Sequence, residues 1–326
     1  RFDEAHRLEI ENYLSVNATS LFVTRQCDTE LDDEFTHFEL VTRLESLINK
    51  TSTGSDSIYN RQLINLPGCG VRLLLKMAND SWNNNLILPS WKMAAMIMIP
   101  KGNSVRSDPA NYRPISLTNS VIKLFEKLAQ TRLDKFIFSH NLINPSQSGF
   151  QKNRQTMDNL FYLAEKIYQA QASNVKNKVC GVVFDISKAF DKVWLQGLIY
   201  KLHMLKLPRK LGNWLANLIT NRSFYVTYGG FSSDIFPIEI GVHQGGILSP
   251  ILFILYINDI FKLIVYPNHD IENLMFADDL FAFTIDTCIR RLMIRMNRYL
   301  KALEVWLNLW RLVMAAHKCS FSIFLG

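Results

Sequence analysis

The chain has 326 residues, 48% of them hydrophobic and 20% charged, which excludes a disordered protein and allows one large or two smaller domains. Its net charge is +7, but residues 1–50 hold 5 Lys and Arg against 11 Asp and Glu, a net of −6. The rest of the chain therefore carries +13, and this basic body behind an acidic flank indicates a polyanionic partner such as a nucleic acid.

The cysteines and the apolar runs exclude two further classes of protein. No two cysteines have metal-ligand or redox spacing, which argues against zinc and against a disulfide framework, and favours a reducing, intracellular setting. The longest apolar run, Ile247–Ile257, contains Ser249 and Pro250 and is too short to span a bilayer, so no membrane anchor is expected. The cysteines are Cys27, Cys69, Cys180, Cys288 and Cys319.

Residues 1–34 are acidic with weak periodicity, and the sequence assigns no function to them. Beyond them, apolar residues recur at helical spacing, and Thr36 and Glu39 have the spacing of a capping box. Thr156 is expected to cap a later helix. The helices predicted in this way cover about 36–48, 63–82, 121–140, 156–167, 198–202, 211–218, 249–257 and 292–303.

Two predicted strands surround a polar loop in the first half of the chain. The apolar run 91–99 predicts a strand that ends near Lys101, and a second strand is expected from Asn111. Lys101 and Arg113 thus flank the loop between them. They could grip a triphosphate, with Arg as a fork and Lys as a point charge, or they could be ordinary solvated cations.

A short apolar run, Val179–Phe184, predicts a strand buried on both faces that ends at Asp185. Asp185 would then lie at the carboxyl end of a central strand, where open α/β sheets bind ligands. Farther along, Phe224–Tyr228 and Ile235–Ile240 predict a hairpin across Gly229-Gly230.

A glycine-containing turn, Gly241–Gly246, leads into a predicted helix with Ser249 as its N-cap and Pro250 at its first position. Glycines before a helix allow the backbone to approach a ligand closely. A plain helix-entry turn is the alternative, because the spacing and the Lys of a P-loop are absent.

Two adjacent carboxylates, Asp278 and Asp279, interrupt the apolar run Leu274–Phe283. The flanking residues predict two short strands, with Asp278-Asp279 as the tight turn between them. Two ionised acids held against a core repel each other and lose hydration, so a cation is expected to compensate them. Mg²⁺ bound by carboxylates and substrate phosphates is a common arrangement, and a solvated turn is the alternative.

Six blocks, in this order, resemble the reverse transcriptases of non-LTR (LINE-like) retrotransposons. The resemblance covers about Phe35 to the end of the chain, and six ordered blocks are much more specific than an Asp-Asp pair alone. The blocks are Asn-Tyr-Arg-Pro-Ile-Ser from Asn111, Gln-Ser-Gly-Phe from Gln147, Phe-Asp-Ile-Ser-Lys-Ala-Phe-Asp-Lys-Val-Trp from Phe184, Gly-Val-His-Gln-Gly-Gly-Ile-Leu-Ser-Pro from Gly241, Tyr-Ile-Asn-Asp from Tyr256 and Phe-Ala-Asp-Asp from Phe276.

The resemblance implies an α+β fold, the right-hand polymerase with fingers and palm. The family's palm is an antiparallel sheet packed on helices, so the strand ending at Asp185 need not have parallel neighbours. No thumb, endonuclease or Cys/His nucleic-acid-binding motif is found, and the chain begins with Arg1 rather than Met, so we expect a piece of a longer retroelement protein. The implied parts are an acidic N-terminal flank at 1–34, mostly fingers at 35–178, and palm at 179–326, with part of 224–241 belonging to the fingers.

The resemblance also implies a two-metal mechanism of nucleotide transfer, in which an RNA-directed DNA polymerase adds dNTPs to a primer 3′-hydroxyl. Asp185 and Asp278 match residues that hold two Mg²⁺ ions, for which Mn²⁺ can substitute. Asp279 and the backbone carbonyl of Ile186 match additional ligands. Lys318 matches a palm lysine proposed to protonate the leaving group.

Other matched positions face the incoming nucleotide. Phe190 matches the steric gate, whose ring under the sugar would exclude a 2′-hydroxyl and so favour dNTPs over NTPs. Lys101 and Arg113 match residues of the family that contact the incoming triphosphate. Gln244 and Gly245 match the block that lies against the nucleotide and the template. The matched dNTP-binding residues are Lys101, Arg113, Ala189, Phe190, Gln244 and Gly245.

The partners implied are an RNA template, a DNA primer, dNTPs and the remainder of the retroelement protein, in a ribonucleoprotein of the nucleus or the cytoplasm. Three other interpretations stay open. A decayed or domesticated nucleic-acid-binding relic is opposed by the intact acidic positions, and an RNA-templated RNA polymerase by Phe190. A group II intron-type reverse transcriptase or maturase is the third, because the sequence around Gly246 also resembles those enzymes. His243 departs from the Pro of many relatives, so the resemblance does not establish how that loop is held rigid.

Overall fold

The computed structural model describes residues 2–18, 21–49, 53–102, 107–173, 175, 177–264 and 271–325. These residues form two compact units, and each unit is assembled from separate segments of the chain. The units are therefore interleaved in sequence. Unit 1 consists of Arg1–Glu11, Asn141–Gly197 and Pro250–Gly326, and unit 2 consists of Asn12–His140 and Leu198–Ser249.

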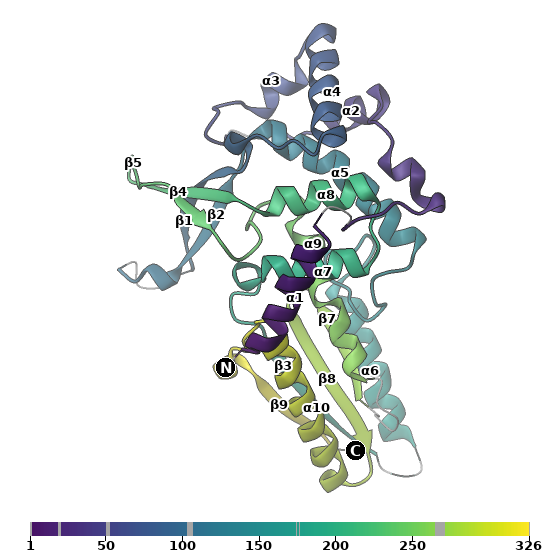
Figure 1. Cartoon of the computed structure of the whole chain (residues 1–326). Helices are drawn as coiled ribbons and strands as arrows, with labels where there is room; N and C mark the ends of the chain where they lie inside the picture. Colours follow the sequence, from purple (N-terminus) through teal and green to yellow (C-terminus); the bar gives the residue numbers. More distant parts are fainter. Residues whose placement is uncertain are drawn as a thin grey trace. The chain divides into compact units, whose positions relative to one another are not determined.

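Unit 1 is built on a four-stranded antiparallel sheet in the order β7-β8-β3-β9 (Figure 1). The predicted buried strand, β3, is central, with β8 on one side and β9 on the other. Its antiparallel neighbours agree with the sheet that the family resemblance implied. The strands are β3 (Lys178–Asp185), β7 (Ile271–Phe276), β8 (Asp279–Asp286) and β9 (Ser320–Phe324).

Two long helices cover opposite faces of this sheet. On one face Val179 of β3 packs in a cluster with Ala170 of α6 (Thr156–Ala172). On the other, Phe184 of β3 lies against Tyr299 of α10 (Ile289–Leu309), with ring centroids 6.4 Å apart. Alternate residues of a strand point to opposite faces, so residues 179 and 184 must face different helices. The apolar stripe predicted for α10 is buried, namely Leu292, Met296, Tyr299 and Leu303.

The other helices around this sheet are shorter than α6 and α10. The block Tyr-Ile-Asn-Asp serves as scaffold: the hydroxyl of Tyr256 donates to the carbonyl of Trp310, and Asn258 donates to the carbonyl of Leu142 at 2.7 Å. The other helices that lie wholly or partly in unit 1 are α1 (Glu4–Val16), η4 (Phe190–Lys192), α7 (Leu195–Met204), α9 (Ser249–Ile257), η5 (Asn258–Ile264) and η6 (Ala316–Lys318).

Unit 2 contains a second sheet, in the order β2-β1-β4-β5, with β6 also paired to β4. The two strands predicted around Lys101 form an antiparallel pair, and β4 lies parallel to β1. The predicted hairpin across Gly229-Gly230 is confirmed, but its return strand begins at Phe231 and is split in two. The strands are β1 (Met93–Pro100), β2 (Tyr112–Leu117), β4 (Arg222–Tyr228), β5 (Phe231–Ser232) and β6 (Phe236–Ile238).

The helices of unit 2 surround two tryptophans. Trp82 and Trp214 are almost fully buried, their rings lie 6.2 Å apart, and Trp214 Nε1 donates to Ser81 Oγ at 3.0 Å. Burying rings of this size is a large part of what holds such a unit together. The helices are η1 (Gln26–Asp32), α2 (His37–Glu45), α3 (Asn60–Ile64), α4 (Gly68–Asn83), η2 (Pro89–Trp91), η3 (Pro109–Asn111), α5 (Ser120–Ser139) and α8 (Arg209–Ile219).

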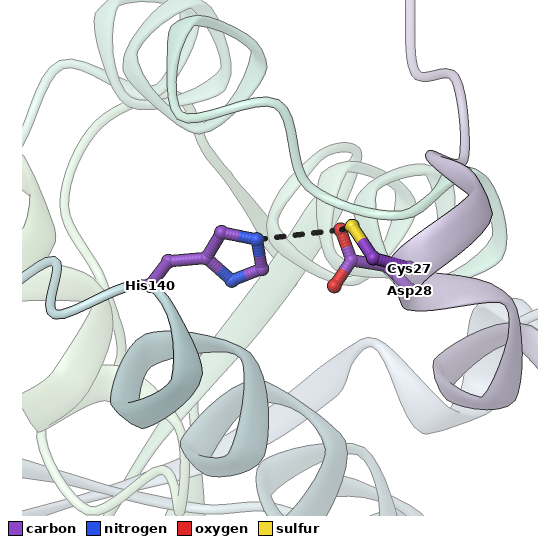
Figure 2. Close-up of side chains that lie close together, drawn as sticks. All are labelled: Cys27, Asp28 and His140. Carbon is purple, nitrogen blue, oxygen red and sulfur yellow. Dashed lines mark hydrogen bonds and ion pairs between the residues drawn. The ribbon is translucent and has the colours of Figure 1, made fainter.

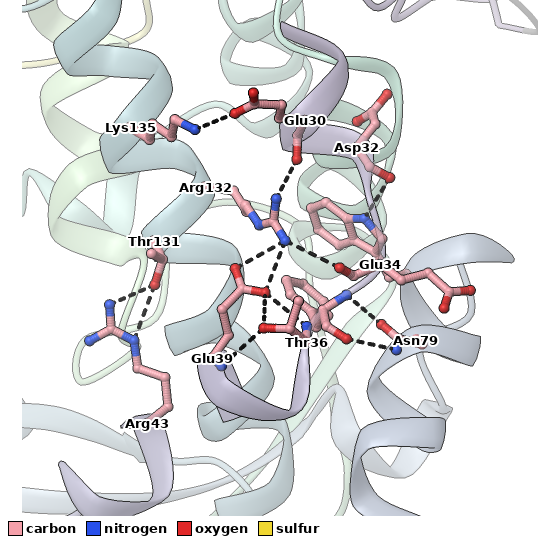
Figure 3. Close-up of polar contacts among 12 residues, drawn as sticks. Glu30, Asp32, Glu34, Thr36, Glu39, Arg43, Asn79, Thr131, Arg132 and Lys135 are labelled. Carbon is pink, nitrogen blue, oxygen red and sulfur yellow. Dashed lines mark hydrogen bonds and ion pairs between the residues drawn. The ribbon is translucent and has the colours of Figure 1, made fainter. Parts of the chain in front are cut away.

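Polar contacts fix η1, part of the acidic flank, against α5. His140, directly after α5, points at Cys27 and Asp28 of η1 (Figure 2). About two turns earlier, the guanidinium of Arg132 donates to the carbonyls of Glu30 and Glu34 and pairs with the Glu39 carboxylate at 3.0 Å (Figure 3). The part of the flank that forms η1 is therefore held in unit 2, whereas Arg1–Glu11 belong to unit 1.

The starts of α2, α5, α6 and α9 agree with the predictions to within one residue, whereas α7, α8 and α10 start two or three residues earlier than predicted and the predicted helix 63–82 is split into α3 and α4. Thr36 and Glu39 form the predicted capping box, with Thr36 Oγ1 accepting from Glu39 N at 3.2 Å. The prediction that Thr156 caps α6 is wrong by one position: Gln155 is the N-cap, and Thr156 is the first helical residue. None of the helices in the described parts of the chain is both long and apolar enough to cross a membrane.

Candidate active site

Three aspartates lie at one end of the unit 1 sheet. Asp185 is the last residue of β3 and Asp279 the first of β8, and the two are directly opposite in the antiparallel ladder. Directly opposed residues point to the same face, with Cβ atoms about 4.5–5.5 Å apart. Asp278 comes directly before Asp279, in the two-residue loop Ala277-Asp278 that joins β7 to β8. The prediction that both Asp278 and Asp279 form the turn is therefore wrong for Asp279, which pairs with Phe276 as a strand residue.

The surroundings of Asp278 and Asp279 disfavour their ionised forms. Burial raises the pKa of Asp278 above its usual value, and the carboxylates of Asp279 and Asp185 raise it further. Burial and the charge of Asp185 likewise raise the pKa of Asp279. Burial is the larger cause and the neighbouring carboxylates add to it, so a cation bound here would favour the ionised forms of both residues.

Lys318 supplies a positive charge at this site. Its Nζ lies 2.7 Å from Asp185 Oδ2, and the Asp185 carboxylate raises the pKa of the Lys318 ammonium. Lys318 belongs to η6, immediately before β9, and its side chain is largely exposed. The structure thus brings together Asp185, Asp278, Asp279 and Lys318, as the sequence predicted.

The chain after β3 continues beside the segment that leads to η6. Ile186 forms an isolated bridge with Met314, flanked by hydrogen bonds from Ser187 N to Val313 O and from Ala315 N to Asp185 O, both 2.8 Å. These bonds use the carbonyl of Asp185 and the N–H of Ser187, so the Ile186 carbonyl is not consumed by the bridge.

Gln147, which the sequence analysis named only as part of a matched block, clamps the loop that carries Asp278. Its Nε2 donates to Ala277 O at 3.1 Å, and its Oε1 accepts from Ala277 N at 3.0 Å and from Gly149 N at 2.9 Å. Ala277 has a φ of +59°, which a residue with a side chain rarely adopts. A Cβ on Gly149 would lie 2.0 Å from Ala277 N, so only glycine fits there. Fully buried Gln147 therefore holds the loop in its strained shape.

Gln147→Met is expected to lower both stability and polymerisation. Methionine has a similar volume but leaves the buried N–H and C=O of Ala277 without these partners, at about 1–3 kcal/mol for each such group. We expect the denaturant midpoint to fall and kcat for nucleotide addition to fall at least about tenfold, because Asp278 loses its fixed position. Gln169→Met, on the exposed surface of α6, is the matched control. A Gln147→Met chain with wild-type kcat would show that the clamp does not position Asp278.

The candidate gate, Phe190, is held by other rings. It stacks on Phe253 of α9, with centroids 4.8 Å apart and planes inclined by 21°, and meets the edge of Phe150 at 6.1 Å. Ala189, just before it, is buried. Phe190 follows the positive-φ residue Lys188, so the chain turns sharply between Asp185 and the ring. The ring orientation is thus set by packing rather than left to rotamer freedom.

The other predicted nucleotide contacts lie in unit 2. Arg113 of β2 is directly opposite Ile99, and the register continues through a 2.8 Å hydrogen bond from Lys101 N to Asn111 O. Lys101 and Arg113 are therefore diagonal neighbours on one face of the strand pair, and both side chains are exposed. The pairing of a lysine and an arginine at one end of this hairpin agrees with the sequence prediction.

The loop with Gln244 and Gly245 is fixed against β2. Gln244 O accepts from Ser116 N at 2.9 Å. Gly245 has a φ of +105°, and a Cβ there would lie 3.2 Å from Ser116 O, so the position suits glycine on both counts.

The same loop is anchored at its far end by Glu126. This buried carboxylate accepts from Ile247 N at 2.9 Å and from Leu248 N at 3.3 Å, at the start of α9. Burial and the cations Arg222 and Lys123 lower the pKa of His243 to about 3, so its ring is neutral at pH 7. The loop is therefore held at both ends by hydrogen bonds, to β2 and to Glu126.

The residues in unit 1 fit hard divalent cations. The candidate ligands are oxygen atoms, three carboxylates and one backbone carbonyl, which is the donor set that Mg²⁺ prefers. Asp185 Oδ2 is inaccessible to solvent, and the cation beside it in the structure is an ammonium. The raised pKa values of Asp278 and Asp279 mark the remaining charge that such a cation would neutralise.

Residues 99–324 match the family described as reverse transcriptase (RNA-dependent DNA polymerase). Because the match covers well over half of the chain, the chain belongs to that family. It is 30% identical over 284 residues to the probable RNA-directed DNA polymerase from transposon BS of Drosophila melanogaster. It is also 30% identical over 285 residues to the RNA-directed DNA polymerase from mobile element jockey of the same species. The chain is thus a reverse transcriptase domain related to those of non-LTR retrotransposons, as its motifs predicted.

These relatives are longer than the chain. Each alignment covers 86% of the chain and 31% of the relative, so the chain spans about a third of their length. Among solved structures, apo telomerase from Candida tropicalis, truncated from its C-terminal domain, superimposes with a TM-score of 0.52 and 13% identity over 77% of the chain and 55% of the telomerase. That likeness supports a polymerase-like α+β fold.

Proposed function

We propose that the chain is the fingers and palm of an RNA-directed DNA polymerase, which extends a DNA primer with dNTPs on an RNA template. Unit 1 would be the palm and unit 2 the fingers. The observation that carries the proposal is the pair Asp185 and Asp279, directly opposed on adjacent strands, with Asp278 in the clamped loop beside them. Such a cluster of acids is costly to the fold and is explained by a cation-dependent reaction.

Asp185, Asp278, Asp279 and the Ile186 carbonyl would hold two Mg²⁺ ions, or Mn²⁺ in their place. Ions bound there favour ionisation of the primer 3′-hydroxyl and neutralise the charge of the triphosphate. Lys318, kept protonated beside Asp185, would give its proton to the departing pyrophosphate.

The residues near the nucleotide would select and align it. The ring of Phe190, with Ala189 before it, would lie under the sugar and leave no room for a 2′-hydroxyl. Lys101 and Arg113 would bind the triphosphate, with Arg113 able to contact two oxygens at once. Gln244 and Gly245 would lie against the nucleotide and the template base.

The proposal has two further parts, and the greater length of the relatives supports the first of them. The working protein would contain the remainder of a retroelement polyprotein, including a thumb. It would act within a ribonucleoprotein that includes its template RNA, in the nucleus or the cytoplasm.

Primer extension tests the function directly. The chain is incubated with poly(rA)·oligo(dT), dTTP and Mg²⁺, and in parallel with Mn²⁺ or with a chelator. We expect extension that requires a divalent ion. Binding of the primer–template without extension, at saturating substrate and with either ion, would overturn the proposal and identify a nucleic-acid-binding relic.

Binding of the primer–template is expected to weaken steeply with salt. The chain outside residues 1–50 carries a net charge of +13, and each phosphate contact releases counterions. About four contacts would lower the affinity at least about a hundredfold between about 50 and 200 mM salt. Fluorescence anisotropy of labelled primer–template measures this slope. A flat response would contradict the inference that the basic body binds the phosphates.

A further inference from the structure

A second cluster of potential metal ligands lies in unit 2. Among the described residues, Cys27, Asp28 and His140 are the group of three whose ligand atoms all lie within 4.8 Å of one another. Cys27 Sγ and His140 Nε2 are each 3.5 Å from the same atom, Asp28 Oδ2. Figure 2 shows the imidazole of His140 directed at the adjacent thiol and carboxylate. The cluster joins residues that are 112 positions apart in sequence (140 − 28).

These distances are those of ligands around a tetrahedral ion. Zinc binds His nitrogen and carboxylate oxygen at about 2.0–2.2 Å and thiolate sulfur at about 2.3 Å. Two such ligands at the tetrahedral angle stand roughly 3.4–3.6 Å apart. A direct ion pair between His and Asp would be shorter, at about 2.7–2.9 Å. The 3.5 Å between His140 Nε2 and Asp28 Oδ2 therefore leaves room for a bridging ion, and the Cys27 thiol, which donates a hydrogen bond to the same oxygen at 3.5 Å, lies at the distance of a third ligand.

The histidine is already oriented as a metal ligand. Its Nδ1 lies 3.0 Å from Phe136 O, and a carbonyl can only accept, so we assign the proton to Nδ1. In the neutral ring, Nε2 then directs a lone pair at Asp28. A backbone carbonyl that fixes the far nitrogen in this way is typical of metal-binding histidines. The ring is also held by packing on Phe136, with centroids 4.3 Å apart.

The chemical types of the ligand atoms and their access to solvent favour zinc. A thiol and an imidazole select a softer ion than the all-oxygen set of unit 1, which suits Mg²⁺. Asp28 is 4% exposed, whereas Cys27 is exposed, so an ion can enter from solvent. The lack of Cys-to-Cys spacing, which argued against zinc in the sequence, does not bear on a site with one cysteine.

We propose that Cys27 Sγ, Asp28 Oδ2 and His140 Nε2 bind a zinc ion, with a water molecule as the fourth ligand, and that this ion fastens η1 to the end of α5. On binding, the Cys27 thiol loses its proton to solvent and the thiolate forms the bond to zinc. The ion is distinct from the catalytic cations and has a structural role in unit 2.

Cobalt substitution tests the site without any activity measurement. The chain is stripped with a chelator, titrated with Co²⁺ in excess Mg²⁺, and then competed with Zn²⁺. We expect one thiolate-to-cobalt charge-transfer band per chain, which Zn²⁺ abolishes. Cys27→Ser should remove the band. Cys69→Ser, which changes another exposed cysteine of unit 2, should keep it. No band in the wild type, or a band that persists in Cys27→Ser, would overturn the proposal.

Thermal unfolding gives an independent readout. Free zinc about 100-fold above its dissociation constant should raise Tm by about 5 °C in the wild type and in Cys69→Ser. The rise should be absent in Cys27→Ser, whose metal-free Tm should be unchanged because its side chain is exposed. Asp28→Asn should bind zinc at least about tenfold more weakly. An equal rise in all variants would show that zinc acts elsewhere and contradict the assignment.

Discussion

Asp278→Asn is expected to abolish primer extension while leaving the fold as stable as before or more stable. The amide keeps the shape of the side chain but cannot supply the negative oxygen that a divalent cation needs. Loss of one such electrostatic contact in an active site costs about 10²- to 10³-fold in kcat. Extension of poly(rA)·oligo(dT) and chemical unfolding, measured on the same preparation, test both halves of the prediction. Asp185→Asn should likewise abolish extension.

The stability half follows from the direction of the pKa shift. Burial and the neighbouring carboxylates raise the pKa of Asp278 in the folded state, so its ionised form opposes folding. This penalty is complete at neutral pH and disappears as the pH falls through the raised pKa towards the unfolded value of 3.8. Wild type and Asp278→Asn should therefore differ in the free energy of unfolding at pH 7 and converge in acid.

Asp286→Asn is the matched control, because Asp286 lies at the other end of β8 and has the opposite shift. Hydrogen bonding to Arg291 lowers the pKa of Asp286, and ion pairs to Arg291 and Arg295 are 2.6 and 3.0 Å long. Its ionised form stabilises the fold at neutral pH, and this contribution is lost in acid. Asp286→Asn should thus lose stability and retain extension. Extension by Asp278→Asn above one tenth of the wild-type rate would remove Asp278 from the metal site.

The strand that ends at Asp185 and the apolar stripe of α10 were predictable from the sequence, because both depend on local hydrophobic periodicity. The candidate site was predictable in its residue types, because the ordered motifs carry the family pattern. Whether β3 pairs with parallel or antiparallel neighbours was not predictable, because an apolar run buried on both faces has the same sequence pattern in both kinds of sheet. Only the resemblance indicated the antiparallel neighbours that β3 has.

The exact turn before Asp279 was not predictable from local sequence. Asp is a favoured turn residue and Ala is not, so local propensity placed the predicted turn one residue too far along the chain. In the structure the clamp from Gln147 and the close approach of Gly149 force Ala277 into the left-handed region. These residues are more than a hundred positions away in sequence. The cluster of Cys27, Asp28 and His140 was missed for the same reason, since no local spacing encodes it.

Phe190→Ala is expected to raise the incorporation of NTPs relative to dNTPs by at least about tenfold. One misplaced group in a packed pocket costs about 10- to 200-fold in kcat/KM, and removal of the ring removes that cost for a 2′-hydroxyl. The ratio of kcat/KM for dTTP and UTP on the same primer–template measures the effect. Phe161→Ala, an exposed phenylalanine of α6 in the same unit, controls for loss of an aromatic ring. The same ratio in Phe190→Ala and wild type would refute the gate and reopen the possibility of an RNA polymerase.

The packing of the ring makes a second variant informative. Phe190 stacks on Phe253 at 4.8 Å, so the gate works only if Phe253 keeps the ring in place. Phe253→Leu keeps an apolar side chain in the buried position but removes the stacked partner. We expect it to relax sugar selection less than Phe190→Ala does, and to change nothing further when the two are combined, because a gate that is absent cannot be misplaced. Additive effects of the two substitutions would mean that Phe253 excludes the 2′-hydroxyl by its own contact and that Phe190 is not its sole gate.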